Sequence, residues 1–205
     1  MLTNWLRKVT RGIVQPIARV LIRLGASPNL LTILGCLINL AAAVIIALVD
    51  LRWGALVLAV AMFFDAFDGA VAREMNRVTA FGGFLDSSLD RVSEFSVLLA
   101  LAWRCLQSTE PRNALLALVA TFGSMMVSYA RARAEGIGVR CHVGLLSRVE
   151  RGILILIGLV SGLVVPMLWI LAIGTLLTSA QRMIYVYLQS SKMSAAKVGK
   201  NDNLS

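Results

Sequence analysis

The stretch Met62–Phe95, MFFDAFDGAVAREMNRVTAFGGFLDSSLDRVSEF, carries four aspartates within sequence that is otherwise apolar enough to lie in a membrane. A charged side chain near the centre of a bilayer costs about 2.5 to 3.5 kcal/mol on insertion scales, so four of them at regular spacing suggest one shared partner. A metal ion is the partner that best accounts for the group. The four residues are Asp65, Asp68, Asp86 and Asp90.

The composition is that of an integral membrane protein. The chain has 205 residues, 58% of them hydrophobic, its mean hydropathy is +0.79, and short basic segments separate several apolar runs. One crossing of a bilayer core about 30 Å thick needs about 20 apolar residues, which leaves room for about six helices. We therefore expect an all-α integral membrane protein with six transmembrane helices, preceded by an amphipathic N-terminal surface helix.

The formal net charge of +9 is distributed as membrane topology requires, not as a nucleic-acid site. If the N-terminus is cytoplasmic, six helices place most lysines and arginines on the cytoplasmic side and only Arg52, Arg104 and Arg112 on the other. This is the positive-inside bias. We expect a multi-pass protein of the cell membrane, with both termini and the mouth of the active site in the cytoplasm and no nucleic-acid partner.

Residues 1–25 predict a helix that lies in the membrane surface. Apolar side chains from Leu2 to Leu24 recur at three- and four-residue steps, with basic side chains between them. Pro16 should bend this helix, because proline removes a backbone donor and crowds the preceding turn. A solvated basic helix is the alternative.

The rest of the chain predicts a six-helix bundle over residues 28–190, within a single domain of residues 1–190. Residues 191–205, rich in Ser, Lys and Asn, should form a disordered cytoplasmic tail. The expected helices run from about Pro28 to Val49, Trp53 to beyond Arg73, Ala80 to Leu106, Asn113 to Glu135, Arg148 to a break at Gly162–Pro166, and from there to near Gln189.

The spacing of the aspartates favours a shared site. Asp65 and Asp68 are three residues apart and Asp86 and Asp90 are four apart, so each pair lies on one helix face. Consecutive helices joined by a short link should pack antiparallel and bring both pairs to the same depth. Four carboxylates repel one another, and a divalent cation would neutralise them. All-oxygen ligation suits Mg²⁺ or Mn²⁺, with Ca²⁺ possible on ligand chemistry alone.

The full pattern that begins at Asp65 is D-x2-D-G-x2-A-R-x8-G-x3-D-x3-D, and it resembles the signature of the CDP-alcohol phosphotransferase (CDP-alcohol phosphatidyltransferase) family at all eight positions. The six-helix plan and the surface helix also look like this family. The resemblance implies transfer of a phosphoalcohol group from a CDP-linked donor to an acceptor hydroxyl, with release of CMP. It also implies a homodimer and two Mg²⁺ or Mn²⁺ ions in each active site.

The resemblance assigns roles to individual residues. It makes Asp90 the general base, which takes a proton from the acceptor hydroxyl. For Asn29 and Thr32, a role as a helix-start cap is an equally weighted alternative, and the small residues of the motif also suit ordinary helix packing. The implied metal ligands are Asp65, Asp68, Asp86 and Asp90. The implied donor-binding residues are Asn29, Thr32, Asp68, Gly69, Ala72, Arg73 and Gly82.

Arginines in the second half of the chain suggest the acceptor. These segments look like the bacterial phosphatidylinositol phosphate synthases of the family, which implies CDP-diacylglycerol as donor and inositol phosphate as acceptor. Arg131 stands where that subgroup commonly has lysine. Glycerol-3-phosphate, the acceptor of a phosphatidylglycerophosphate synthase, is the alternative. For Arg133, Arg140 and Arg148 the positive-inside rule is explanation enough. The implied phosphate pocket is Ser128, Arg131, Arg151 and Arg182.

Two other classes of protein remain open. A cation transporter or channel also places aspartates within the membrane, but it does not require the glycines and Arg73 at their spacings. An aspartate-rich membrane prenyltransferase would carry two separate aspartate-rich motifs, and only one composite motif is present. His142, in a polar loop, is expected to be solvated. Three separated cysteines indicate neither a disulfide framework nor a zinc site.

Overall fold

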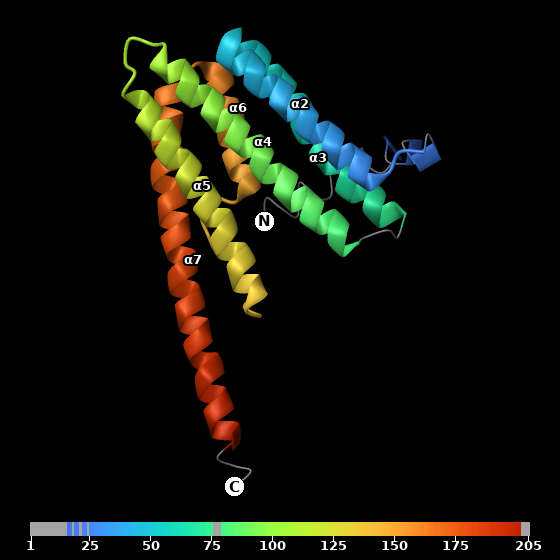
Figure 1. Ribbon diagram of the computed structural model, residues 1–205, viewed down its shortest axis with the longest axis vertical. Coiled ribbons are helices and arrows are strands. Elements are labelled where there is room, and N and C mark those ends of the chain that lie inside the picture. Colours follow the sequence, from blue (N-terminus) through green and yellow to red (C-terminus); the bar gives the residue numbers. More distant parts are fainter. Residues whose placement is uncertain (1–15, 18, 21, 24, 76–78, 202–205) are drawn as a thin grey trace. The chain divides into compact units, whose positions relative to one another are not determined.

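The described part of the chain is helical. In a computed structural model, this part comprises residues 16–17, 19–20, 22–23, 25–75 and 79–201, without the side chains of residues 66, 68–70, 73 and 191–201. It contains six long helices (Figure 1). They are α2 (Pro28–Leu48), α3 (Leu51–Glu74), α4 (Ala80–Leu106), α5 (Asn113–Gly136), α6 (Arg148–Ser161) and α7 (Val164–Asn201).

Within the described residues, three segments are long and apolar enough to cross a membrane: Pro28–Leu48, Asn113–Gly136 and Val164–Ser190. All six elements of the described part are α-helices, which confirms the all-α class. Six membrane crossings stay a prediction, because α3 carries charged residues and α6 has only 14 residues. The predicted surface helix lies mostly outside the described residues, and a single domain over residues 1–190 also stays a prediction.

The helix starts follow from local capping. The Ser27 hydroxyl accepts a hydrogen bond from the Leu30 amide at 3.2 Å, and Pro28 occupies the first turn of α2. The Asp50 carboxylate accepts bonds from the amides of Arg52 at 2.8 Å and Trp53 at 3.2 Å. Asp50 thus starts α3 at Leu51, slightly before the expected Trp53.

The end of α7 differs from the prediction. The helix was expected to end near Gln189, but it continues to Asn201. The extension SKMSAAKVGKN contains no proline, and its Met, Ala and Lys residues have high helix propensity. Polar composition alone was therefore a poor signal for the end of this helix. The described helix covers most of the predicted disordered tail, and disorder of that tail in solution stays a prediction.

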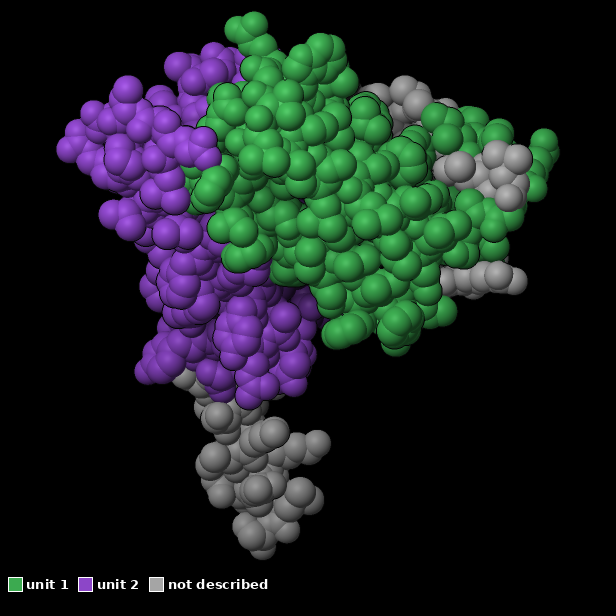
Figure 2. Space-filling model, turned by 45° about the horizontal axis from the view of Figure 1, so that its top comes forward, with its two compact units in different colours: residues 1–104 green, residues 105–205 purple. Residues whose placement is uncertain are grey.

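The chain forms two compact units, residues 1–104 and 105–205 (Figure 2). In the first unit α2 and α3 run side by side (Figure 1). A Cβ on Gly54 would lie 2.3 Å from Cγ1 of Ile46, so only glycine permits this tight connection. Leu31 and Val71 form a buried cluster between the two helices, and Ile22, Ala26, Phe64, Phe67 and Met75 pack against it.

In the second unit α7 packs against both α5 and α6. A Cβ on Gly123 of α5 would lie 2.0 Å from Oγ1 of Thr175 on α7, so the two backbones approach closely there. Polar residues such as Thr175, Thr178 and Ser179 are buried, whereas Phe122 and Ile173 are exposed. Buried small polar residues with exposed apolar ones are typical of helices that face lipid.

Candidate active site

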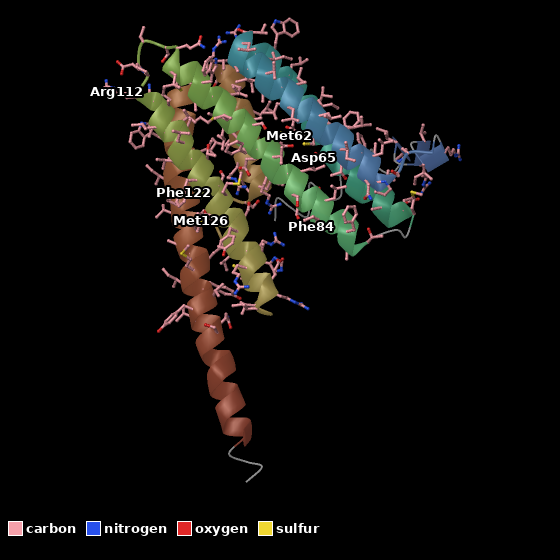
Figure 3. All side chains as sticks on the ribbon, in the orientation of Figure 1. Met62, Asp65, Phe84, Arg112, Phe122 and Met126 are labelled. Atoms are coloured by element: carbon pink, nitrogen blue, oxygen red, sulfur yellow. The ribbon has the colours of Figure 1, made fainter. Side chains whose placement is uncertain are left out.

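The aspartate motif lies on α3 and α4, within the first unit. Asp65 is one turn after Met62 on α3, and Phe84 precedes Asp86 near the start of α4 (Figure 3). Oδ1 of Asp65 lies 3.0 Å from the position that a Cβ on Gly35 would occupy. Any larger residue at position 35 on α2 would therefore press on this carboxylate.

Asp90 is the most buried of the three motif aspartates whose side chains are described, with 9% of its surface exposed. Asp65 and Asp86 are half-buried. Nη1 of Arg91 lies 3.9 Å from Oδ2 of Asp90 and also donates a hydrogen bond to the Ser87 carbonyl. A cation held by its own helix thus lies beside the buried carboxylate.

The metal ligands are only partly described. Within the described residues, no group of three or more His, Cys, Asp and Glu side chains is arranged to hold a metal ion, and the Asp68 side chain is not among those residues. The donor set itself suits a hard divalent cation, because it offers only carboxylate oxygens. Asp65, Asp68, Asp86 and Asp90 as ligands therefore remain a proposal.

The structure brings two of the predicted donor-binding residues together. Oδ1 of Asn29, at the start of α2, lies 3.4 Å from the position of a Cβ on Gly82, in the first turn of α4. The Gly82 amide donates to Oγ1 of Thr79 at 3.0 Å, which fixes the start of α4. Thr32 is buried, and its hydroxyl donates to the Pro28 carbonyl at 3.1 Å.

Other predicted donor-binding residues are placed by their helix alone. Ala72 is half-buried on α3. Asp68, Gly69 and Arg73 belong to the same helix, and their side-chain surroundings lie outside the description.

Two of the four predicted acceptor residues are buried arginines. Arg151, in the first turn of α6, is 1% exposed, and Arg182, on α7, is 5% exposed. Ser128 is half-buried on α5. Arg131 is instead exposed, and its Nε donates to Oε1 of Glu135 at 2.9 Å on the same helix. Arg131 is thus the least constrained member of the predicted pocket.

Both buried arginines bind the segment that connects α5 to α6. Nε of Arg182 donates to the Val143 carbonyl at 2.9 Å, and Nη1 of Arg151 donates to the Leu146 carbonyl at 3.2 Å. Among the described residues Nη2 of Arg182 donates no hydrogen bond. Two guanidinium groups held by one segment form an arrangement that suits a phosphate.

Sequence reasoning missed the residues that hold this segment. Thr178 on α7 accepts a hydrogen bond from the Leu146 amide at 3.1 Å. Its position, four residues before Arg182 in TSAQR, places it on the same helix face and could have drawn attention to it. Gly144 has a φ of +135° and carried no recognisable signal in the sequence.

Comparison with known proteins agrees with the motif. Residues 26–186 match the family model described as CDP-alcohol phosphatidyltransferase. An archaetidylinositol phosphate synthase from Methanothermobacter thermautotrophicus is 39% identical over 90% of this chain and 93% of its own length. A phosphatidylinositol phosphate synthase from Corynebacterium glutamicum is 35% identical over 87% of this chain and 85% of its own.

Solved structures show the same likeness. The crystal structure of Mycobacterium tuberculosis phosphatidylinositol phosphate synthase with CDP-DAG bound superimposes with a TM-score of 0.81 at 34% identity, covering 85% of this chain and 94% of that one. A second structure of that enzyme, in complex with manganese and citrate, also has a TM-score of 0.81, with 85% and 88% covered. The chain described here belongs to the CDP-alcohol phosphatidyltransferase family.

Proposed function

We propose that this protein transfers the phosphatidyl group of CDP-diacylglycerol to a hydroxyl of inositol phosphate and releases CMP, giving phosphatidylinositol phosphate. The complete aspartate motif on α3 and α4 carries the reaction class. The relatives' names differ in their lipid part but share inositol phosphate. The two buried arginines of the second unit suit a phosphorylated acceptor.

The donor is assigned to the first unit. Asn29, Thr32, Asp68, Gly69, Ala72, Arg73 and Gly82 are the proposed donor-binding residues. Glycine and alanine at three of these positions leave room for a nucleotide to approach the helix backbones. The proximity of Asn29 to Gly82 supports this assignment, because it places the start of α2 beside the start of α4.

The aspartates are assigned to metal and base. Asp65, Asp68, Asp86 and Asp90 would hold two Mg²⁺ or Mn²⁺ ions, and manganese in a related structure supports this. When bound, these ions offset the charge of the donor diphosphate and of the leaving CMP. Asp90 takes the proton from the acceptor hydroxyl as that oxygen attacks the phosphorus bearing the lipid, and the bond from that phosphorus to CMP breaks. Burial of Asp90 keeps bulk water away from this proton transfer.

The acceptor phosphate is assigned to Ser128, Arg131, Arg151 and Arg182. The two buried arginines are already oriented by carbonyl oxygens, so little rotamer freedom is lost when an anion binds. Arg131 pairs with Glu135 at an exposed position, where such a pair contributes about 0 to 1 kcal/mol. Its guanidinium can therefore leave Glu135 for a phosphate at small cost.

The proposal includes location and assembly. The membrane-length helices and the family support a multi-pass protein of the cell membrane. Both termini and the active-site mouth are proposed to be cytoplasmic, on the distribution of basic residues. A homodimer is proposed on family resemblance.

One assay tests the function. The purified protein is supplied with CDP-diacylglycerol and Mg²⁺ or Mn²⁺, and CMP release is measured separately with inositol phosphate, free inositol and glycerol-3-phosphate. Inositol phosphate is expected to give the highest kcat/KM. A higher value with free inositol would remove the four-residue phosphate pocket, and a higher value with glycerol-3-phosphate would make the protein a phosphatidylglycerophosphate synthase. Absence of metal-dependent CMP release would favour a transporter or channel.

A further inference from the structure

The segment Val143–Ser147, here called the α5–α6 loop, is hydrogen-bonded to α7 through the buried hydroxyl of Thr178 as well as through Arg182. Thr178 has no exposed surface. Its Oγ1 donates to the Gly174 carbonyl of its own helix at 2.7 Å and accepts from the Leu146 amide of the loop at 3.1 Å. The hydroxyl therefore uses both its proton and a lone pair, and it joins the loop to the helix.

Two glycines let the loop and the helix interlock. A Cβ on Gly144 would lie 2.5 Å from Cγ2 of Thr178 and 3.4 Å from Nε of Arg182, and the φ of +135° at Gly144 disfavours other residues. On the helix side, a Cβ on Gly174 would lie 2.3 Å from Cδ1 of Leu146. The loop thus has one close-fitting position against the face of α7 that carries Gly174 and Thr178.

This loop also supplies carbonyl partners to both buried arginines of the proposed pocket. The Val143 carbonyl accepts from Arg182, and the Leu146 carbonyl accepts from Arg151. The backbone of Leu146 is therefore bonded to Thr178 through its amide and to Arg151 through its carbonyl. A shift of the loop would move the hydrogen-bond partners of both guanidinium groups together.

We infer that Thr178 is a positioning residue for acceptor binding. Its hydroxyl fixes the α5–α6 loop, and the loop in turn orients Arg151 and Arg182 for the acceptor phosphate. The inference rests on the proposed function for the identity of the acceptor. It adds a residue that does not itself touch the substrate, and it predicts an effect on acceptor recognition that leaves donor recognition unchanged.

The test compares Thr178→Val with Thr178→Ser. Valine keeps the shape and removes the hydroxyl, so the KM for inositol phosphate should rise about three- to tenfold, as expected from loss of one buried hydrogen bond. The KM for CDP-diacylglycerol should stay at the parent value. Serine keeps Oγ1, so Thr178→Ser should restore the KM for inositol phosphate.

Thr121→Val is the matched control. Thr121 is also buried, on α5, but its hydroxyl donates at 2.7 Å to the Ala117 carbonyl of its own helix. This variant loses an intrahelical hydroxyl bond without releasing a loop, so both KM values should remain unchanged. Gly144→Ala changes the loop itself at its contact with Thr178, and it should raise the KM for inositol phosphate as Thr178→Val does.

Hydrogen exchange supplies a readout that needs no substrate. A peptide that contains Leu146 should exchange faster in Thr178→Val than in the parent protein, Thr178→Ser or Thr121→Val. If the parent protein releases no CMP with inositol phosphate, the proposed function fails, and unchanged exchange in Thr178→Val would separately overturn the positioning of the loop. Where the parent is active, equal rises in both KM values, or a Thr178→Ser variant as impaired as Thr178→Val, would overturn the inference.

Discussion

Nη1 of Arg182 on α7 donates a hydrogen bond to the backbone carbonyl of Val127 on α5 at 2.5 Å. The same guanidinium binds the Val143 carbonyl through Nε, so one buried side chain joins α5, α7 and the α5–α6 loop. The fork of an arginine can make these bonds and still present another nitrogen to a ligand.

Arg182→Lys should raise the KM for inositol phosphate at least tenfold. Lysine keeps the charge, but a single ammonium cannot bind two separate carbonyls and a phosphate with the planar geometry of a guanidinium. Steady-state kinetics with each substrate varied in turn would measure the effect. Arg133→Lys, at an exposed position on α5, is the matched control and should behave as the parent. An unchanged KM in Arg182→Lys would exclude Arg182 from the acceptor pocket.

Asp90→Asn should retain CDP-diacylglycerol binding and lose transfer. The amide is nearly isosteric with the carboxylate but cannot take the acceptor proton, and loss of a general base typically costs about 10² to 10⁴ in rate. Donor binding to the purified variant and CMP release in the presence of inositol phosphate would be measured side by side. Turnover near the parent rate would remove Asp90 from the base role.

Chelation of divalent cations should abolish CMP release, and Mg²⁺ or Mn²⁺ should restore it. Asp65→Asn should raise the metal concentration needed for half-maximal activity, because one anionic ligand is lost. A titration of activity against metal concentration would measure this shift. Asp50→Asn, at the turn before α3 and outside the motif, should leave the titration unchanged. Full activity in the presence of a chelator would contradict a metal site.

The ion pair between Arg19 and Glu74 should hold the end of α3 in place and contribute slightly to the stability of the fold. Nε of Arg19 lies 2.9 Å from Oε1 of Glu74, next to the motif residue Arg73. Arg19→Glu should lower the midpoint of thermal unfolding and raise the KM for CDP-diacylglycerol. The pair is largely exposed, so its coupling should be about 0.2 to 1 kcal/mol.

Adding Glu74→Arg to Arg19→Glu should restore both quantities by reversing the pair. Arg23→Glu is the matched control, because it makes the same charge change on the same segment without an ion pair among the described residues. If Arg23→Glu and Arg19→Glu have equal effects, surface charge rather than the ion pair is responsible.

The start of α3 should weaken in acid. Hydrogen bonds from the amides of Trp53 and Arg52 hold the pKa of Asp50 below its ordinary value of 3.8. A lowered pKa in the folded state means that the carboxylate stabilises the fold above pH 3.8, and this stabilisation is lost as pH falls through the folded pKa. Unfolding midpoints of the parent and Asp50→Asn, compared from about pH 6 to about pH 3, should therefore converge on acidification. A constant difference would contradict the assignment.

Much of the fold could be predicted because its signals are local. Ser27 and Pro28 indicated the start of α2, and the bounds predicted for α4 agree with those of the structure. The far end of α7 could not be predicted, because the polar composition of its last turns suggested disorder while its helix propensities favoured continuation.

The sequence by itself determined the aspartate motif and, through it, the family. Spacings of three and four residues on a helix place side chains on one face whatever the surroundings, so this part of the site could be read without the tertiary structure. It also identified Arg151 and Arg182 as unusual charges in apolar helices. Only the tertiary structure decided that one loop binds both arginines and that Thr178 and Gly144 hold this loop. The contacts of Thr178 and Arg182 join α7 to residues far away in the chain, so they depend on how α7 packs against the loop and not on any local period.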